Sequence, residues 1–287
     1  MNEQFHLGII GGSGLYDFPS LSGKETRDIE TPFGKPSSPI VTGSIKGRNI
    51  AFLARHGIGH IISPSEINYR ANIYALKMLG VTQIVSVSAC GSLREDYAPG
   101  QIVIPDQIFD HTHQRVRSFF GEGIVAHISA PSPFCPRLSQ KLSFAFSKTD
   151  AVVHNGGTYI TIEGPRFSTV AESNVYRSWG MSIIGMTACP EIFLAKEAEI
   201  CYVTMAHVTD YDVWHHSEEH VSVEMVIRTL QQNTTTAQKA IANLIEDLEL
   251  DDECECHNCL KDSIMTRPDL ISNKTKQNLG LIINKYL

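Results

Sequence analysis

The sequence lacks any apolar run of about 18 residues, the length that a helix needs to cross a bilayer. Its opening segment, MNEQFHLGII, lacks the basic start and the cleavage site of a secretory signal peptide. It also lacks an excess of basic residues: the formal net charge is −7, which gives no electrostatic footprint for nucleic acid. We therefore expect a cytoplasmic protein whose partners include neither a membrane nor a nucleic acid.

Hydrophobic residues make up 42% of the 287 residues and charged residues 19%, a balance typical of a compact globular protein. The 7 cysteines are an odd number in a chain long enough to build an apolar core. Such a chain does not need disulfides for stability, so we expect reduced thiols. Because the net charge is negative, an anionic substrate would have to be held by a local group of donors.

Segments with the pattern of strands alternate with segments with the pattern of helices. The strands are expected at 6–11, in a hairpin at 39–54, and at 81–89, 101–109, 158–162, 181–186 and 200–208. The helices are expected at 64–79, 136–148, 168–179, 188–199, 218–248 and 274–286. This alternation predicts an α/β fold with a central mixed β-sheet flanked by helices. The polar stretch 249–262 is the only candidate boundary. We expect one domain, residues 1–248, followed by a C-terminal helical extension, residues 249–287.

Loops that follow four of these strands carry glycine, hydroxyl or carboxylate groups. They lie at 11–14, 89–92, 186–187 and 210–212. In open α/β sheets, ligands bind at the carboxyl ends of strands, so these loops are expected to converge on one small molecule.

Three segments have groups that suit an anion or a sugar. The turn GGSG at 11–14 exposes backbone N–H groups, but Asp17 stands where a dinucleotide fingerprint needs glycine. Arg55 and His56 follow a buried-looking strand, and a guanidinium fork matches two phosphate oxygens. The run SACGS at 88–92 ends the most apolar strand with hydroxyls and small residues that could touch phosphate or ribose. A tight structural turn and a surface ion pair remain alternatives for the first two.

Two carboxylates follow the strand at 200–208. Asp210 and Asp212 are two residues apart, so they point the same way if the strand persists. A buried carboxyl with a raised pKa can act as a general acid, which a departing purine requires at its N7. A solvated turn is the alternative.

Two further patterns raise the question of metal. Residues 216–220 read H-x-x-E-H, which occurs in some zinc peptidases, but they fall at the junction expected between a loop and a helix. The run CECHNC at 254–259 is rich in thiols, but its spacing is not that of a four-ligand site. We expect no metal ligands, and the role of Cys254, Cys256 and Cys259 stays open between a metal, a redox pair and neither.

Taken together, ordered motifs over residues 5–248 resemble the 5′-methylthioadenosine phosphorylase branch of the purine nucleoside phosphorylase family. These motifs are GIIGGSGLYD at 8–17, TPFGKPS at 31–37, LARHG at 53–57, SACGSLRE at 88–95, TIEGPRFS at 161–168, MTACPE at 186–191, AKEAEICY at 195–202 and TDYDVW at 209–214. Six or more motifs in this order are far more specific than any one of them.

The resemblance implies phosphorolysis of 5′-methylthioadenosine to adenine and 5-methylthioribose 1-phosphate, within methionine and purine salvage. Inorganic phosphate is then a co-substrate, and no cofactor is needed. Cleavage of adenosine or inosine by the same chemistry and a hydrolytic nucleosidase, which would not need Arg55 and His56, are the alternatives. Because the family forms trimers, we expect a homotrimer or a hexamer of two trimers.

The resemblance also implies a role for each site residue. The phosphate site is expected from Ser13, Arg55, His56, Ser88, Ala89 and Thr187. The nucleoside site is expected from Phe167 near the base, Met186 at the ribose, Asp210 at N7, Asp212 at the 6-amino edge, Val223 at the 5′ group and His127 from a neighbouring subunit.

The residues at two positions indicate which purine is bound. Relatives that cleave 6-oxopurines usually carry asparagine at position 210 and glutamate at 168, where this chain has Asp210 and Ser168. A glutamate would accept from the N1–H of an oxopurine, whereas adenine N1 is itself an acceptor. The mismatch is worth roughly 1–3 kcal/mol, so the pair favours adenine. Gly185 departs from the branch, which often has asparagine there, and Ser13 and Ser88 replace threonines.

Overall fold

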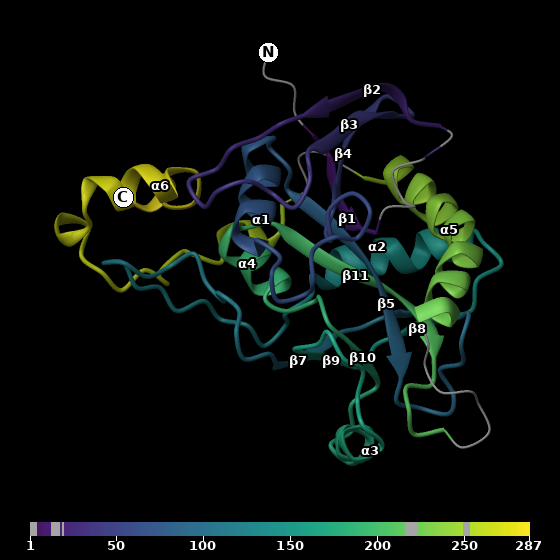
Figure 1. The fold of residues 1–287 in the computed structure, drawn as a ribbon. Coiled ribbons are helices and arrows are strands. Elements are labelled where there is room, and N and C mark those ends of the chain that lie inside the picture. The colour runs from purple at the N-terminus through teal and green to yellow at the C-terminus, as the bar shows by residue number, and fades with distance from the viewer. Residues whose placement is uncertain (1–4, 13–17, 19, 216–222, 249–252) are drawn as a thin grey trace.

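The computed structural model describes residues 5–12, 18, 20–215, 223–248 and 253–287 (Figure 1). Within these residues it contains a single sheet of 11 strands. The strands are β1 Leu7–Gly11, β2 Ser22–Arg27, β3 Ile40–Ile45, β4 Arg48–Ala54, β5 Gln83–Ser92, β6 Ile102–Ile104, β7 Gln107–His111, β8 Val153–Asn155, β9 Thr158–Ile162, β10 Ile183–Gly185 and β11 Cys201–Asp210. The helices are α1 Tyr69–Met78, α2 Pro136–Ser147, α3 Val170–Ser178, α4 Glu191–Glu197, α5 Val223–Glu246 and α6 Asn273–Ile283, with short 3-10 turns at Glu255–Asn258, Pro268–Leu270 and Asn284–Tyr286.

The sheet is mixed and centres on β5. β4, β1, β5 and β11 lie parallel to their neighbours in that order, so their carboxyl ends share one edge. Beyond the end of β1, the same side of β5 pairs with the antiparallel β10, which leads on to β9 and β7. The N-terminal hairpin β3–β4 carries the edge strand β2, and β11 also pairs with β6. The mixed α/β sheet predicted from the sequence is confirmed.

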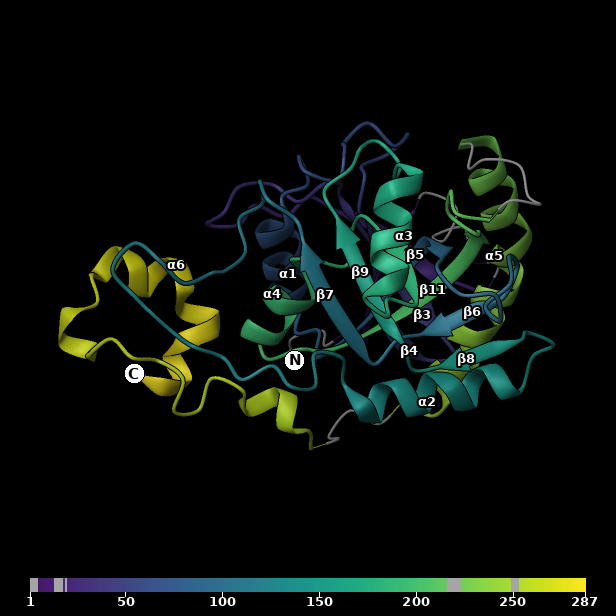
Figure 2. The same cartoon turned by 90° about the horizontal axis from the view of Figure 1, so that it is seen from below.

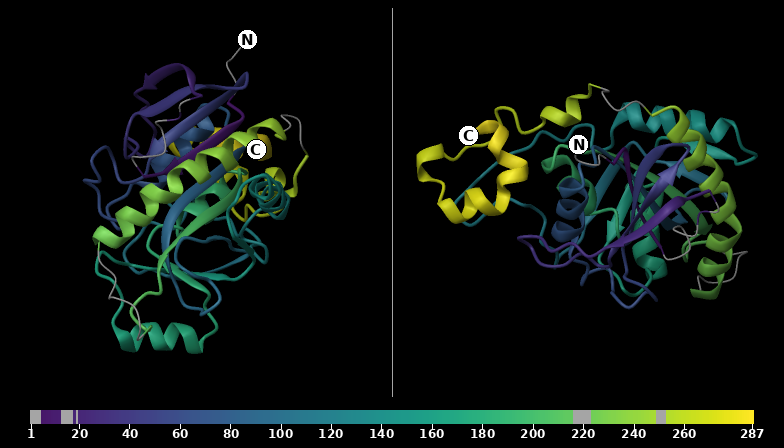
Figure 3. Two further views of the ribbon diagram at one scale, coloured as in Figure 1. Left: turned by 90° about the vertical axis from the view of Figure 1, so that its right-hand side faces the viewer. Right: turned by 90° about the horizontal axis from the view of Figure 1, so that it is seen from above.

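Both faces of the central strands are covered by helices, as Figures 1 and 3 show. Successive side chains of β1 point to opposite faces, and each face belongs to a different core. Ile10 packs in one cluster with residues of α1 and α4, while Leu7 and Ile9 pack in another with residues of α2 and α5. This double burial explains why the strands read as nearly continuous apolar runs.

The helix ends follow local capping chemistry. The Asn68 side chain accepts from the N–H of Ala71, so α1 begins at Tyr69 rather than at the expected residue 64. Gly80, at φ 79°, ends it as expected. Thr169 and Glu172 form a reciprocal capping box at the start of α3. None of the described helices is long and apolar enough to cross a membrane.

Two expectations about the strands are wrong, and two strands were not expected. The single strand expected at 101–109 is two strands, because Pro105 has no N–H to donate and β6 and β7 pair with different neighbours. The strand expected at 81–89 does not end at residue 89: β5 continues to Ser92 and pairs there with β10. β2 and β8 have no clear strand pattern in the sequence. The first is a polar, exposed edge strand without apolar alternation, and the second has three residues.

The C-terminal extension packs against the α1 and α4 side of the domain, as Figure 2 shows for α6. Leu260, Leu279 and Ile283 belong to the same apolar cluster as these helices. The long segment between β7 and α2 runs alongside the extension, and Ala126 and Ile264 form an isolated β-bridge. The extension therefore shares the core of the domain that precedes it.

Candidate functional site

The carboxyl ends of the parallel strands place the predicted site residues at one edge of the sheet. The N–H of Arg55, just after β4, donates to the carbonyl of Gly11 at the end of β1. In the register of β5 and β11, Ala89 lies opposite His207, and Gly91 lies opposite Asp210. β10 runs back along the end of β5, which brings residues 186–187 to the same edge. The convergence predicted for the four loops is therefore met by the parts that the structure describes.

The guanidinium of Arg55 is 2% exposed and forms a buried ion pair with Glu191, at the first position of α4. Nε and Nη2 donate to the two carboxylate oxygens at 2.7 and 2.9 Å, Nη2 also donates to Ser86 Oγ, and Nη1 donates to the carbonyl of Val87. Burial alone would lower the pKa of Arg55, but the carboxylate of Glu191 outweighs it and the pKa is raised. Four of the five N–H groups are thus engaged, which leaves one on Nη1 for an anion. The role of Glu191 was missed, although it ends the motif at 186–191.

His56 presents a neutral ring with a defined tautomer. Its Nδ1 lies 2.9 Å from the carbonyl of Ile62, which can only accept, so Nδ1 carries the proton. Burial, followed by the charge of Arg55, lowers the pKa of His56 to about 4. The ring stacks on His60 with centroids 4.2 Å apart. Nε2 is consequently an acceptor near neutral pH, suited to a protonated oxygen of phosphate.

Asp210 is buried at the last position of β11. Its Oδ2 accepts from the Thr209 hydroxyl at 2.6 Å, and its Oδ1 accepts from the N–H of Asp212 at 2.8 Å. Burial raises the pKa of Asp210 to about 6 despite these two bonds. Gly91 makes the position possible, since a Cβ there would lie 2.9 Å from Asp210 Oδ1. A carboxyl with this pKa can exist in either protonation state near neutral pH, which is what a general acid requires.

Asp212 does not continue the strand. Its φ of 51° is left-handed, so the expectation that both carboxylates point the same way along a strand is wrong. Burial raises the pKa of Asp212, while the hydroxyls of Ser173 and Ser168 act in the opposite direction. Asp212 Oδ2 and Ser168 Oγ are nevertheless buried without an aligned hydrogen-bond partner among the described residues. Such buried polar atoms at a site are ready to bind a ligand.

Tyr159 fills the space beside Gly185. A Cβ at position 185 would lie 2.0 Å from the hydroxyl oxygen of Tyr159, so no larger residue fits unless Tyr159 moves. That hydroxyl lies 3.4 Å from the Oγ of Ser88, a predicted phosphate ligand. The tyrosine on β9 therefore occupies the volume that the asparagine expected from the resemblance would need.

The turn that carries Met186 and Thr187 is held by Arg115. Its guanidinium donates to the carbonyls of Met186 and Cys189 at 2.6 Å and to that of Glu163 at 2.7 Å. The Met186 side chain is half-buried and Thr187 is buried. Phe167, by contrast, is 38% exposed, as a side chain that meets a bound base needs to be. Arg115 was not recognised from the sequence, because nothing near it in the chain indicates its partners.

Other expected residues lie elsewhere. Ser13, with most of the first loop, and the H-x-x-E-H segment at 216–220 are outside the described residues, as is the side chain of Val223. His127 is exposed beside the C-terminal extension, where its N–H donates to the carbonyl of Ser263. It belongs to the segment between β7 and α2 and not to the loops that carry Asp210 and Arg55.

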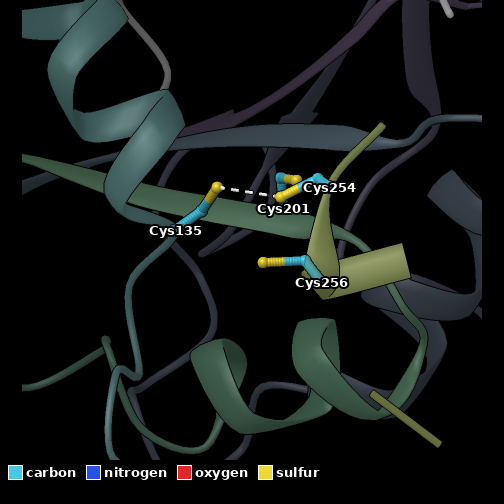
Figure 4. A group of neighbouring side chains, drawn as sticks. All are labelled: Cys135, Cys201, Cys254 and Cys256. Carbon is cyan, nitrogen blue, oxygen red and sulfur yellow. Dashed lines mark hydrogen bonds between the residues drawn. The ribbon is translucent and has the colours of Figure 1, made fainter. Parts of the chain in front are cut away.

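Four of the cysteine side chains form a cluster that their spacing in the sequence did not predict. The sulfur atoms of Cys135, Cys201, Cys254 and Cys256 all lie within 4.8 Å of one another (Figure 4). They come from the N-cap of α2, the start of β11 and the C-terminal extension. The run at 254–259 thus supplies only half of a four-sulfur group.

A model of the phosphorylase superfamily matches residues 6–246. The chain belongs to the phosphorylase superfamily. S-methyl-5′-thioadenosine phosphorylases of Koribacter versatilis and Geobacter sulfurreducens are 49% and 50% identical to it. The alignments cover 99% and 98% of this chain and 97% and 99% of those proteins. The likeness therefore includes the C-terminal extension, beyond the residues matched from motifs.

Solved structures agree with this assignment. A methylthioadenosine phosphorylase from an Antarctic soil metagenomic library, 46% identical, superposes with a TM-score of 0.94 over 98% of this chain and 99% of that one. The methylthioadenosine phosphorylase of Schistosoma mansoni in complex with adenine, 36% identical, has a TM-score of 0.83 and covers 98% of each chain. The nucleoside phosphorylase type of fold expected from the sequence is confirmed.

Substitution of Arg55 is expected to destabilise the protein rather than only to weaken phosphate binding. Arg55→Ala leaves the buried carboxylate of Glu191 without its partner, which should lower the free energy of unfolding by about 3–5 kcal/mol. The double variant Arg55→Met/Glu191→Leu should recover a large part of that loss. Urea denaturation of the three proteins checks this, with Arg267→Ala, which breaks an exposed ion pair with Asp269, as the control. Unchanged stability in Arg55→Ala would contradict this role of the ion pair.

Proposed function

We propose that this chain is an S-methyl-5′-thioadenosine phosphorylase, a pentosyltransferase. It cleaves 5′-methylthioadenosine with inorganic phosphate into adenine and 5-methylthioribose 1-phosphate. The observation that carries the proposal is the buried Asp210, with its pKa near 6, at the same sheet edge as the segment Arg55–His56. The relatives that match nearly the whole chain carry this name, and a mutant of the adenosine/methylthioadenosine phosphorylase of Schistosoma mansoni was solved in complex with methylthioadenosine.

In the proposed reaction, phosphate binds beneath the anomeric carbon. The free N–H of Arg55 and the hydroxyls of Ser88 and Thr187 donate to its oxygens, and His56 Nε2 accepts from its protonated oxygen. Ala89 contributes its backbone, and Ser13 completes the site from the first loop. The phosphate dianion then stabilises the oxocarbenium character that develops at the sugar. Preorganised charge of this kind is usually the largest catalytic contribution.

The two carboxyl groups bind the adenine that leaves the sugar. Asp210 in its protonated form donates to N7 as negative charge grows on the base. Asp212 Oδ2, buried without an aligned partner among the described residues, accepts from the 6-amino group. Ser168, being small, leaves adenine N1 facing no carboxylate. Met186 packs on the ribose, Phe167 on the base, and Val223 on the 5′ methylthio group.

The assembly and the location are also part of the proposal. We infer a homotrimer, or a hexamer of two trimers, in which His127 reaches the site of a neighbouring subunit. Exposed apolar groups on β7 and just after α3 support an interface: Phe109 and Trp179 are 40% and 50% exposed, with ring centroids 5.8 Å apart. The enzyme works in the cytoplasm on small molecules and needs no metal or organic cofactor for the reaction.

Base release should depend on phosphate and on the purine. Measured side by side, methylthioadenosine and adenosine should release adenine, and inosine should react about 5- to 150-fold more slowly, the equivalent of about 1–3 kcal/mol. Omitting phosphate should stop release from all three nucleosides. Equal release without phosphate would identify a hydrolytic nucleosidase, and a preference for inosine would identify a 6-oxopurine enzyme.

Asp210→Asn should lower turnover of methylthioadenosine by about 10²-fold or more, the scale of losing a general acid. Because the pKa of Asp210 is raised from 3.8 to about 6, the protonated form is lost as pH rises through 6. The wild-type kcat/KM should therefore fall above that pH, and the fall should vanish in Asp210→Asn while any limb due to phosphate persists. Asp269→Asn, at an exposed site, is the matched control. Near-normal turnover of Asp210→Asn would remove Asp210 from the mechanism.

The exposed aromatic patch should govern assembly. Light scattering of the wild type is expected to give a mass of about three or six chains. Trp179→Glu should reduce that mass and lower activity, since a charge opposes burial of the patch and the site would lose His127 from its neighbour. Val152→Glu, on another exposed apolar residue, should leave the mass unchanged. A monomeric and fully active wild type would exclude the trimer.

A further inference from the structure

A tetrahedral zinc ion and the four clustered sulfurs match in size. Zinc–sulfur bonds of about 2.3 Å give an edge of about 3.8 Å between sulfurs in a tetrahedron. The sulfurs of Cys135 and Cys254 lie 3.7 Å apart, and all four lie within 4.8 Å of one another. A disulfide needs only one pair of sulfurs, at about 2.05 Å. The mutual closeness of all four is instead what a single central ion requires.

The surroundings favour thiolates. Cys135 caps the first turn of α2, and its sulfur accepts from the N–H of Leu138. A helix N-terminus stabilises a thiolate. The guanidinium of Arg137 lies 3.9 Å from the sulfur of Cys201, and Nε2 of His257 lies 3.5 Å from the same sulfur. The N–H groups and cation would offset the negative charge of a tetrathiolate centre.

We propose that Cys135, Cys201, Cys254 and Cys256 form a structural zinc site that fastens the C-terminal extension to the catalytic domain. Each ligand binds as a thiolate, and the thiol protons displaced by Zn²⁺ pass to solvent. Four protein ligands close the coordination sphere, so the ion has no open position for substrate or water. This proposal replaces our expectation from the sequence that the chain has no metal ligands, and it does not depend on the proposed enzymatic reaction.

The arrangement explains why the ligands are spread along the chain. Cys135 and Cys201 are buried in the domain, whereas Cys254 and Cys256 are half-buried in the extension. Without an ion, the extension still shares the apolar core through residues such as Leu260. Zinc would add a link at the beginning of the extension, just after residues 249–252.

The test is the metal content of the full-length protein, purified after expression with Zn²⁺ and dialysed. About one zinc per chain is expected, and Cys254→Ser/Cys256→Ser should lose at least about nine-tenths of it. Cys259→Ser is the matched control, since this thiol lies in the same extension but donates to the carbonyl of Lys196 outside the cluster. It should keep its zinc. A chelator should lower the melting temperature of the wild type and of Cys259→Ser, but not that of the double variant.

A second measurement on the wild type guards against a double variant that does not fold. Metal-free protein titrated with Co²⁺ should develop the visible bands of a tetrahedral tetrathiolate centre, and Zn²⁺ should abolish them. The proposal is overturned if folded wild type takes up neither ion, or if the double variant keeps its zinc. It is also overturned if mass spectrometry under non-reducing conditions finds the four cysteines joined as disulfides.

Discussion

The buried ion pair of Arg55 and Glu191 is the interaction on which the site depends. The groups that surround it come from three elements: Ser86 and Val87 on β5, Glu191 on α4, and Tyr202 on β11, whose hydroxyl also donates to the carboxylate. Burying two charges costs several kcal/mol, and only a complete set of hydrogen bonds offsets that cost. Both carboxylate oxygens and most of the guanidinium are satisfied here, so only one relative placement of these elements is favourable.

The pairing of the strands carries this fixed placement to the residues proposed to act in catalysis. Arg55 follows β4, which pairs with β1, and β1 pairs in turn with β5. These two registers fix the position of Ala89 along the strands relative to Arg55, and the register of β5 with β11 sets Asp210 opposite Gly91. Arg115 completes the frame by holding the carbonyls of Met186 and Glu163. The residues proposed to bind phosphate and base are thus held by rigid elements, which is how a site supplies preorganised charge.

Much of this could be predicted because strand ends have a common geometry. Apolar runs located the parallel strands, and glycine, hydroxyl and carboxylate groups after them located the site edge. Contacts between distant segments could not be predicted. Glu191 lies 136 positions from Arg55, and the Tyr159 hydroxyl takes the volume beside Gly185 through packing alone. The left-handed φ of Asp212 could not be predicted either, because aspartate is enriched in that conformation but adopts it at only a small share of its positions.

β11 separates the two kinds of chemistry in the molecule. Cys201 is its first residue and Asp210 its last, so at about 3.3 Å per residue the cysteine cluster and the proposed general acid lie about 30 Å apart. An ion at Cys201 cannot touch the reacting atoms, and over about 30 Å at an effective dielectric constant of about 20 a unit charge contributes only about 0.6 kcal/mol. It can only act on the site by fixing the start of a strand buried along its whole length. The two ends of β11 therefore have separate roles. The proposed zinc site at its start anchors the extension, and its last residue, Asp210, holds a carboxyl group out of water.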